Sequence, residues 1–142
     1  MEDTPLEHVD DAEDVARRCN RGHARPGQAV KWQAFVATKR PHRISSHRLA
    51  RCSPWADCCD DLATRGFAVV NAARIRTAVE NGDVRQHGPD VAHANILVAP
   101  MGTRDTAFET LEELKADAKL WDRHVAILEQ LASMARPLDL PT

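Results

Sequence analysis

The chain has 142 residues, a length that suits one domain with a sizeable hydrophobic core. Its formal net charge is −2 at pH 7, so the overall balance points to no particular class of partner. No apolar run is long enough to span a bilayer and no basic-then-apolar leader stands at the start, so we expect a cytoplasmic protein without a membrane partner. The absence of Tyr and the excess of Arg over Lys suggest a GC-rich coding bias, typical of a bacterial or phage gene.

Charge is distributed unevenly near the N-terminus. Residues 1–14 contain seven acidic residues and no Lys or Arg, which predicts a flexible acidic tail. Residues 17–51 contain ten Lys or Arg and no acidic residue. This basic segment predicts a surface for nucleic acid or another acidic partner, through Arg40, Arg43, Arg48 and, from a later helix, Arg74. The alternatives are that the acidic tail folds back and neutralises the segment, or that it is ordinary solvated surface.

The patterning predicts elements in the order α-β-α-β-α-β-α, an α/β or α+β domain with a small three-stranded sheet in residues 15–105. Two capping signals stand out: Ser53-Pro54 begins a helix, and Asn71 begins another that Asn81-Gly82 ends. The expected elements are helix 11–19, strand 30–37, loop 42–51, helix 54–65, strand 67–70, helix 72–80, a turn at 88–90, strand 95–99 and a long final helix.

The final helix is predicted over Thr106–Arg136, followed by a C-terminal tail, 137–142. Its apolar residues fall in the three-four alternation of a heptad seam: Leu111, Leu114, Ala118, Trp121, Val125, Leu128, Ala132 and Ala135. Thr106 and Glu109 form a capping box, and Pro137 ends the helix. At about 1.5 Å per residue the helix would measure about 45 Å. We expect a homodimer or a helical protein partner at Leu111, Leu114, Trp121, Val125 and Leu128; the alternative is a core helix of a monomer.

Three runs, ADCCDDLATRGFAVVNAARI, ANILVAP and RDTAFETL, resemble nucleoside 2-deoxyribosyltransferase-like proteins. The resemblance implies a nucleoside-processing glycosyl transferase or hydrolase. Glu109 would then be the nucleophile that attacks the anomeric carbon, with Asp105 and Asn71 near the sugar or the base. A carboxylate at a helix N-terminus stays ionised, which suits covalent catalysis. The other interpretation of Glu109 is that it only caps the helix.

A second layout is a winged helix-turn-helix, a DNA-binding arrangement. Helices 54–65 and 72–80 would flank a turn at Gly66, and a hairpin through Gly88-Pro89 would form the wing. Arg74 would then face the DNA, and the final helix would dimerise the protein.

The cysteines offer a third kind of site. In a cytosolic protein they are expected to be free thiols or metal ligands rather than disulfides. Cys19, His23, Cys52 and Cys58 (or Cys59) could hold zinc, although the spacing matches no standard zinc pattern. The alternative is four buried thiols and no cofactor.

From these patterns we expect a non-enzymatic binding or regulatory protein. It would self-associate or bind a partner through the C-terminal helix and engage an acidic partner through the basic segment. The glycosyl transferase and the DNA-binding regulator remain as alternatives.

Overall fold

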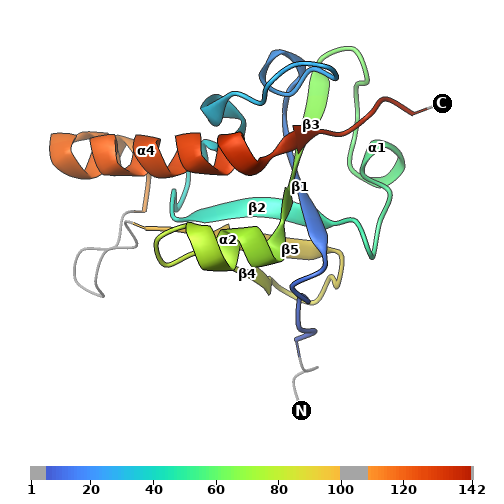
Figure 1. Ribbon diagram of the computed structural model, residues 1–142, viewed down its shortest axis with the longest axis horizontal. Coiled ribbons are helices and arrows are strands. Elements are labelled where there is room, and N and C mark those ends of the chain that lie inside the picture. The colour runs from blue at the N-terminus through green and yellow to red at the C-terminus, as the bar shows by residue number, and fades with distance from the viewer. Residues whose placement is uncertain (1–5, 100–108, 142) are drawn as a thin grey trace.

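The structure, a computed structural model, describes residues 6–99 and 109–141. Within these residues the fold is α+β, built on one six-stranded antiparallel sheet with the strand order β4-β5-β2-β1-β3-β6 (Figure 1). The strands are β1 (Asp14–Asn20), β2 (Arg43–Arg48), β3 (Arg65–Asn71), β4 (Asp83–Gln86), β5 (His93–Leu97) and β6 (Arg136–Pro137). The helices are α1 (Pro54–Asp57), α2 (Ala72–Ala78), α3 (Leu111–Lys115) and α4 (Ala118–Met134), with short 3-10 helices η1 (Arg21–His23) and η2 (Trp32–Phe35).

The predicted three-stranded sheet is therefore wrong. Strands 67–70 and 95–99 correspond to β3 and β5, but β1 replaces most of predicted helix 11–19, predicted loop 42–51 contains β2, and predicted strand 30–37 contains η2. Strands β4 and β6 were not predicted either, and β1 and β2 place polar side chains on the covered face of the sheet. Ser46 and Arg48 are buried on this face of β2, and Arg17 of β1 donates to the Ser45 and Val36 carbonyls at 3.0 and 2.9 Å. Because these residues interrupt the apolar alternation, the period-two signal is lost.

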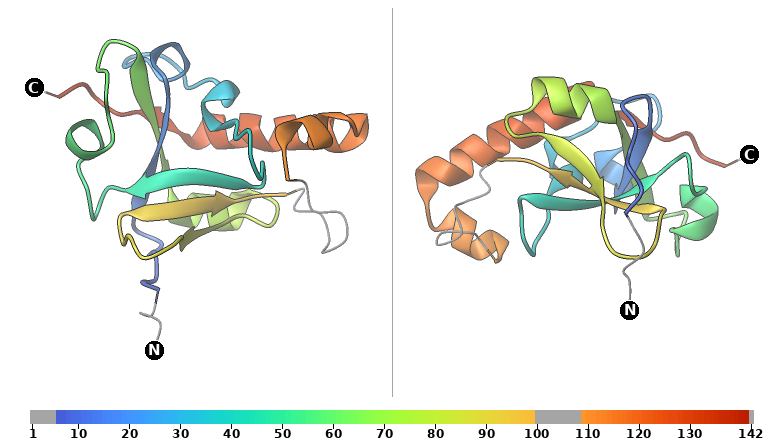
Figure 2. Two further views of the ribbon diagram at one scale, coloured as in Figure 1. Left: turned by 180° about the vertical axis from the view of Figure 1, so that it is seen from behind. Right: turned by 90° about the horizontal axis from the view of Figure 1, so that it is seen from below.

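The two faces of the sheet are covered unequally. The main core packs one face beneath η2, α2 and α4, with Val15, Ile44, Ile75, Ile96 and Leu128 among its members. The opposite face has a smaller cluster around Phe67, against which the Trp55 ring packs edge-on at 4.9 Å. Figure 2 shows α1, which carries Trp55, at the far end of the molecule from the start of α4. Polar side chains of β2 and β5 lie on this second face next to α1.

The predicted helix over 106–136 is also wrong, since two helices with separate caps stand in its place. The Thr110 side chain accepts a hydrogen bond from the Glu113 amide at 3.2 Å, so the α3 cap lies four residues after Thr106, which is outside the described residues. Asp117 then caps α4 by accepting from the Leu120 amide at 3.2 Å. An Asp side chain that binds a backbone amide favours a new helix start over continuation. With 17 residues, α4 measures about 25 Å.

Helix α2 begins and ends close to where its capping residues predict. Asn71 accepts from the Arg74 amide at 3.2 Å, and Asn81 adopts a positive φ of 55° after the helix ends at Ala78. A Cβ at Gly82 would lie 2.2 Å from the Ile75 carbonyl, so only glycine fits there. Helix α1 ends at Asp57, well short of the predicted Arg65, and strand β3 separates it from α2. A helix-turn-helix places a turn at this point, whereas here the chain crosses the sheet.

The acidic N-terminal segment packs against the basic one. Val9 is 1% exposed, and Glu13 bonds both Nε and Nη2 of Arg48 at 2.8 Å. Glu7 lies 3.0 Å from Arg48 Nη2 and also pairs with Arg51. These contacts correspond to the alternative in which the tail folds back, at least from residue 6 onward.

His124 is a fully buried imidazole on the core side of α4. Its Nδ1 donates to the Ala99 carbonyl at 3.4 Å, and Nε2 has no hydrogen-bond partner among the residues that the structure describes. Burial lowers the pKa of His124, and burial likewise lowers that of His42. The unfolded chain therefore binds more protons than the folded chain below about pH 6.5, so the protein is expected to lose stability as the pH falls through this range.

Replacement of His124 by Leu is expected to reduce this acid sensitivity. Urea unfolding at pH 7.5 and 5.5 measures it as the difference between two unfolding free energies, and this difference should be smaller in the variant than in the wild type. His8, exposed on the N-terminal segment, supplies the matched control, since His8→Leu should leave the difference unchanged. If this difference in unfolding free energy is the same in wild type and in His124→Leu, His124 is not a source of the acid sensitivity.

Candidate metal centre

The loop after β2 brings two cysteines next to a histidine of that strand. His47, Cys52 and Cys58 are each half-buried, and one ligand atom from each lies within 4.8 Å of the others. His47 stands on the second face of the sheet, opposite His93 of β5 and Ala16 of β1. Tetrahedral zinc with these donors would separate the ligand atoms by about 3.5–3.8 Å, so only a small closure of the loop is needed.

Hydrogen bonds from the strands hold the cysteine loop in place. The Cys52 amide and thiol both donate to the Arg48 carbonyl, at 3.1 and 3.3 Å. Arg18, on β1, donates to the Cys58 carbonyl at 3.2 Å, and the Cys58 amide closes α1 on the Pro54 carbonyl at 2.9 Å. The two thiols are thus positioned by backbone contacts that do not involve a metal.

The protonation states of the three side chains follow from their surroundings. Burial, reinforced by Cys58, raises the pKa of the Cys52 thiol to about 11, and burial also raises the pKa of Cys58. Burial and then the neighbouring His93 lower the pKa of His47. Without a metal, both thiols are protonated and the imidazole is neutral at pH 7. Metal binding would release the thiol protons, since thiolate is the form that coordinates.

A pocket of about 570 Å³ opens in front of this group. All its lining residues except Ala92 carry polar or thiol side chains: Arg18, Ser45, His47, Arg51, Cys52, Asp57, Cys58, Asp90, Ala92 and His93. A metal held by three side chains here would keep one coordination position facing the pocket. That is the arrangement of catalytic zinc sites, whereas structural sites are closed by a fourth protein ligand.

Two of the four residues predicted as metal ligands belong to this group and two do not. Cys19 is buried in the main core, where burial raises its pKa to about 11, and His23 lies in η1. Sequence reasoning missed His47 because its segment was expected to be a loop. The spacing His47-x4-Cys52-x5-Cys58 could have indicated it, once β2 was assigned as a strand.

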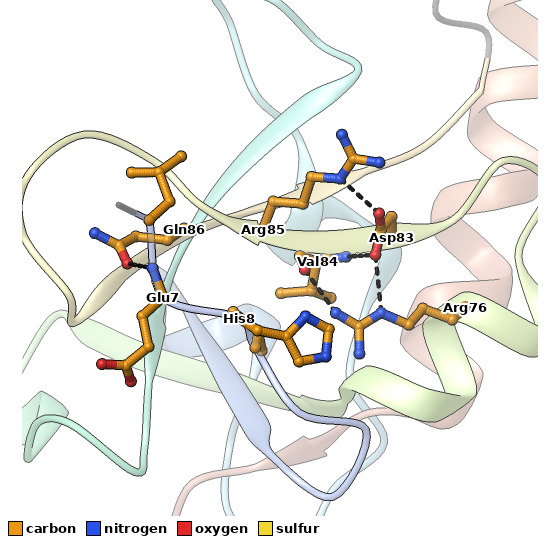
Figure 3. A pocket seen from close by; sticks show the side chains of 9 residues that line it. Glu7, His8, Arg76, Asp83, Val84, Arg85 and Gln86 are labelled. Carbon is orange, nitrogen blue, oxygen red and sulfur yellow. Dashed lines mark hydrogen bonds and ion pairs between the residues drawn. The ribbon is translucent and has the colours of Figure 1, made fainter. Parts of the chain in front are cut away.

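Another pocket, of about 390 Å³, lies between the N-terminal segment and β4 (Figure 3). Arg76 enters it from α2 and bonds Asp83 and Asp11 at 2.8 and 2.7 Å, and Arg85 also bonds Asp83 at 2.7 Å. Figure 3 shows the two guanidinium groups on either side of the Asp83 carboxylate. Glu7, which also lines the pocket, pairs with Arg48 and Arg51. Because these charged side chains already have partners of opposite charge, the pocket offers little to a charged ligand.

The two described residues of the glycosyl transferase assignment, Asn71 and Glu109, have separate partners in the fold. Asn71 caps α2 and donates to the Asp11 carbonyl at 3.2 Å. Glu109 is exposed just before α3 and pairs with Arg40 at 3.7 Å. Asp105 lies outside the described residues.

The arginines predicted for polyanion binding occupy different environments. Arg43 and Arg74 are exposed on β2 and α2, and Arg40 pairs with Glu109. The Arg48 side chain is 3% exposed and bound by carboxylates, so it is not accessible to a polyanion.

The predicted interface residues are used largely within the chain. Leu111, Leu114 and Leu128 are buried, and Trp121 packs edge-on against Trp32 of η2 at 6.4 Å. Val125 is half-buried. Leu111 and Leu114 of α3 and Leu128 of α4 are therefore buried within their own chain, whereas Trp121 and Val125 of α4 remain partly exposed.

Comparison with protein-family models, with curated proteins and with solved structures found no match to the chain. Among the described helices, none combines the length and apolar character needed to cross a membrane.

Proposed function

We propose that this chain is a zinc-binding protein in which His47, Cys52 and Cys58 hold the ion and an exogenous ligand takes the fourth position. The observation that carries the proposal is the convergence of three ligand atoms within 4.8 Å at the wall of a polar pocket. The donor set is one imidazole from strand β2 and two thiols from the loop that follows it.

The donor set favours zinc over the hard divalent cations. Thiolate and imidazole suit zinc, whereas calcium and magnesium require oxygen ligands. Two thiolates neutralise the 2+ charge of the ion, so the half-buried centre would carry no net charge. The open position would admit water or a substrate oxygen, which zinc polarises as a Lewis acid.

Zinc titration of the reduced protein against a chromophoric chelator tests the proposal. We expect one zinc per chain, and cobalt substitution should give the intense absorption of a tetrahedral, thiolate-ligated ion. The variants His47→Ala, Cys52→Ala and Cys58→Ala should each weaken binding more than about 100-fold, since even outer-shell changes cost about 10–100-fold.

The matched control is Cys59→Ala, which removes the adjacent half-buried thiol without touching the three-residue group. It should bind zinc as the wild type does. Stoichiometric binding that survives Cys52→Ala, or the absence of zinc binding by folded, reduced wild-type protein, would refute the proposed centre.

A further inference from the structure

A serine and a histidine form a hydrogen-bonded pair beside the proposed metal centre. Ser45 lies on β2 and His93 on β5, and Ser45 Oγ is 2.7 Å from His93 Nε2. Both side chains are half-buried and line the pocket of about 570 Å³. Neither belongs to the three-residue metal group.

The direction of the hydrogen bond follows from the other side of the imidazole ring. His93 Nδ1 is 3.2 Å from the His87 carbonyl, and a carbonyl can only accept. Nδ1 therefore carries the proton, and in the neutral ring Nε2 is an acceptor for the Ser45 hydroxyl. The His93 ring is also packed between the rings of His47 and His87, with centroids at 5.9 and 5.6 Å, which restricts its rotation.

Ser45, His93 and the His87 carbonyl thus form a hydrogen-bonded chain of nucleophile, base and orienting acceptor. This is the relationship that activates serine in hydrolases. We propose that Ser45 is a catalytic nucleophile and His93 its general base, in the transfer of an acyl group from an ester to water. Ser45 Oγ would attack the carbonyl carbon while His93 Nε2 takes the hydroxyl proton. The C–O bond to the leaving alcohol then breaks, and His93 returns the proton to that alcohol.

Hydrolysis of the acyl-serine completes the cycle by the same route in reverse. Water attacks the acyl carbon as His93 takes its proton, and the proton returns to Ser45 as the carboxylic acid leaves. Each step moves one proton and one acyl group, so it needs no oxidant and no further reactant.

The pocket also limits the substrate. Its lining includes one aliphatic side chain, Ala92, so it would favour a small polar acyl group over a long hydrocarbon chain. Arg18 and Arg51 line the same walls together with Asp57 and Asp90, so the pocket carries charges of both signs. The proposal does not depend on zinc, because the hydrogen bond between Ser45 Oγ and His93 Nε2 involves no metal.

A fluorophosphonate probe tests the pair directly, because it reacts with an activated serine by the same attack. Ser45 Oγ would bond to phosphorus, fluoride would leave, and His93 would take the proton. The reaction is run with EDTA present so that zinc binding has no part in the outcome, and labelling is located by peptide mass spectrometry. Wild-type protein should be labelled at Ser45, and His93→Gln should react at least about 100-fold more slowly.

Ser46 provides the control from the same strand. It lies on the opposite face, buried, with its hydroxyl donating to the Ala94 carbonyl at 3.0 Å. Ser46→Ala should be labelled as the wild type is, and Ser45→Ala should not be labelled. Folded wild-type protein that is not labelled, or labelling that persists in Ser45→Ala, would overturn the proposal while leaving the zinc titration unaffected.

Discussion

Glu13→Ala is expected to lower the free energy of unfolding by about 3 kcal/mol, because it leaves the Arg48 guanidinium buried without its principal counter-ion. Arg48 is 3% exposed, and Glu13 binds it through two hydrogen bonds of 2.8 Å, to Nε and Nη2. Glu7 remains as a partner, with Oε1 3.0 Å from Arg48 Nη2, but its side chain is 34% exposed and also pairs with Arg51. Urea denaturation followed by circular dichroism at pH 7 measures the loss.

Two further variants separate the ion pair from general effects of losing a carboxylate. Glu129→Ala removes an exposed carboxylate from α4 and should change stability by less than about 0.5 kcal/mol. Joint replacement Glu13→Leu with Arg48→Met removes both charges and should recover part of the loss, as apolar replacements of buried pairs do. A loss below about 1 kcal/mol in Glu13→Ala would show that the pair is not buried in solution.

The ion pair between Glu13 and Arg48 also makes the protein less stable in acid. Hydrogen bonds from Arg48 lower the pKa of Glu13 below its usual range near 4.5. The stabilisation is therefore present in full above about pH 4.5 and is lost as the pH falls through the lowered pKa. The loss from this pair begins only below about pH 4.5, whereas the effect of the buried histidines begins below about pH 6.5.

Local signals predicted those parts of the fold whose stability is also local. The Asn71 cap and the Asn81-Gly82 end of α2 act within one turn of the helix, and the apolar runs of β3 and β5 are buried strands. Strand β2 could not be predicted in this way. Its covered face carries Ser46 and Arg48, and what makes Arg48 acceptable there is Glu13, 35 residues earlier in the sequence.

The candidate site was only partly predictable for the same reason. Cys52 and Cys58 are close in sequence and were recognised as possible ligands, but His47 joins them only because β2 places its side chain beside their loop. The Ser45–His93 pair spans 48 residues and depends on the antiparallel register between β2 and β5. Cys19 was assigned by its spacing to His23, yet β1 turns its side chain into the core.

The charge segregation in the first 51 residues has an internal explanation in the fold. The acidic segment supplies the carboxylates that pair with the buried Arg48 of β2 and with the exposed Arg51 of the following loop. Composition alone suggested a surface for an external acidic partner. The contacts show that part of this complementarity is satisfied within the chain. Arg40, Arg43 and Arg74 are the exposed members of the predicted set, and Arg40 pairs with Glu109.

Leu128→Asp distinguishes a core helix from a dimer helix, because the two arrangements predict different consequences. Leu128 is fully buried in the main core, where α4 crosses the sheet. Loss of a buried leucine costs about 2–5 kcal/mol, and placing a carboxylate there adds the cost of its desolvation. The whole stability of a domain is commonly about 5–15 kcal/mol. We therefore expect the variant to be largely unfolded, with the loss of near-ultraviolet circular dichroism and of a cooperative thermal transition.

Ala126→Asp is the matched control, since Ala126 is exposed on the same helix. It introduces the same charge two residues away and should leave a folded protein with a cooperative transition. If α4 instead mainly joined two chains, Leu128→Asp would yield a folded monomer, and sedimentation would show the mass halving relative to wild type. That result would show that Leu128 lies at an interface between two chains. Unfolding of the variant, with no change of oligomeric state in the fraction that stays folded, would show that α4 is a core helix of the monomer.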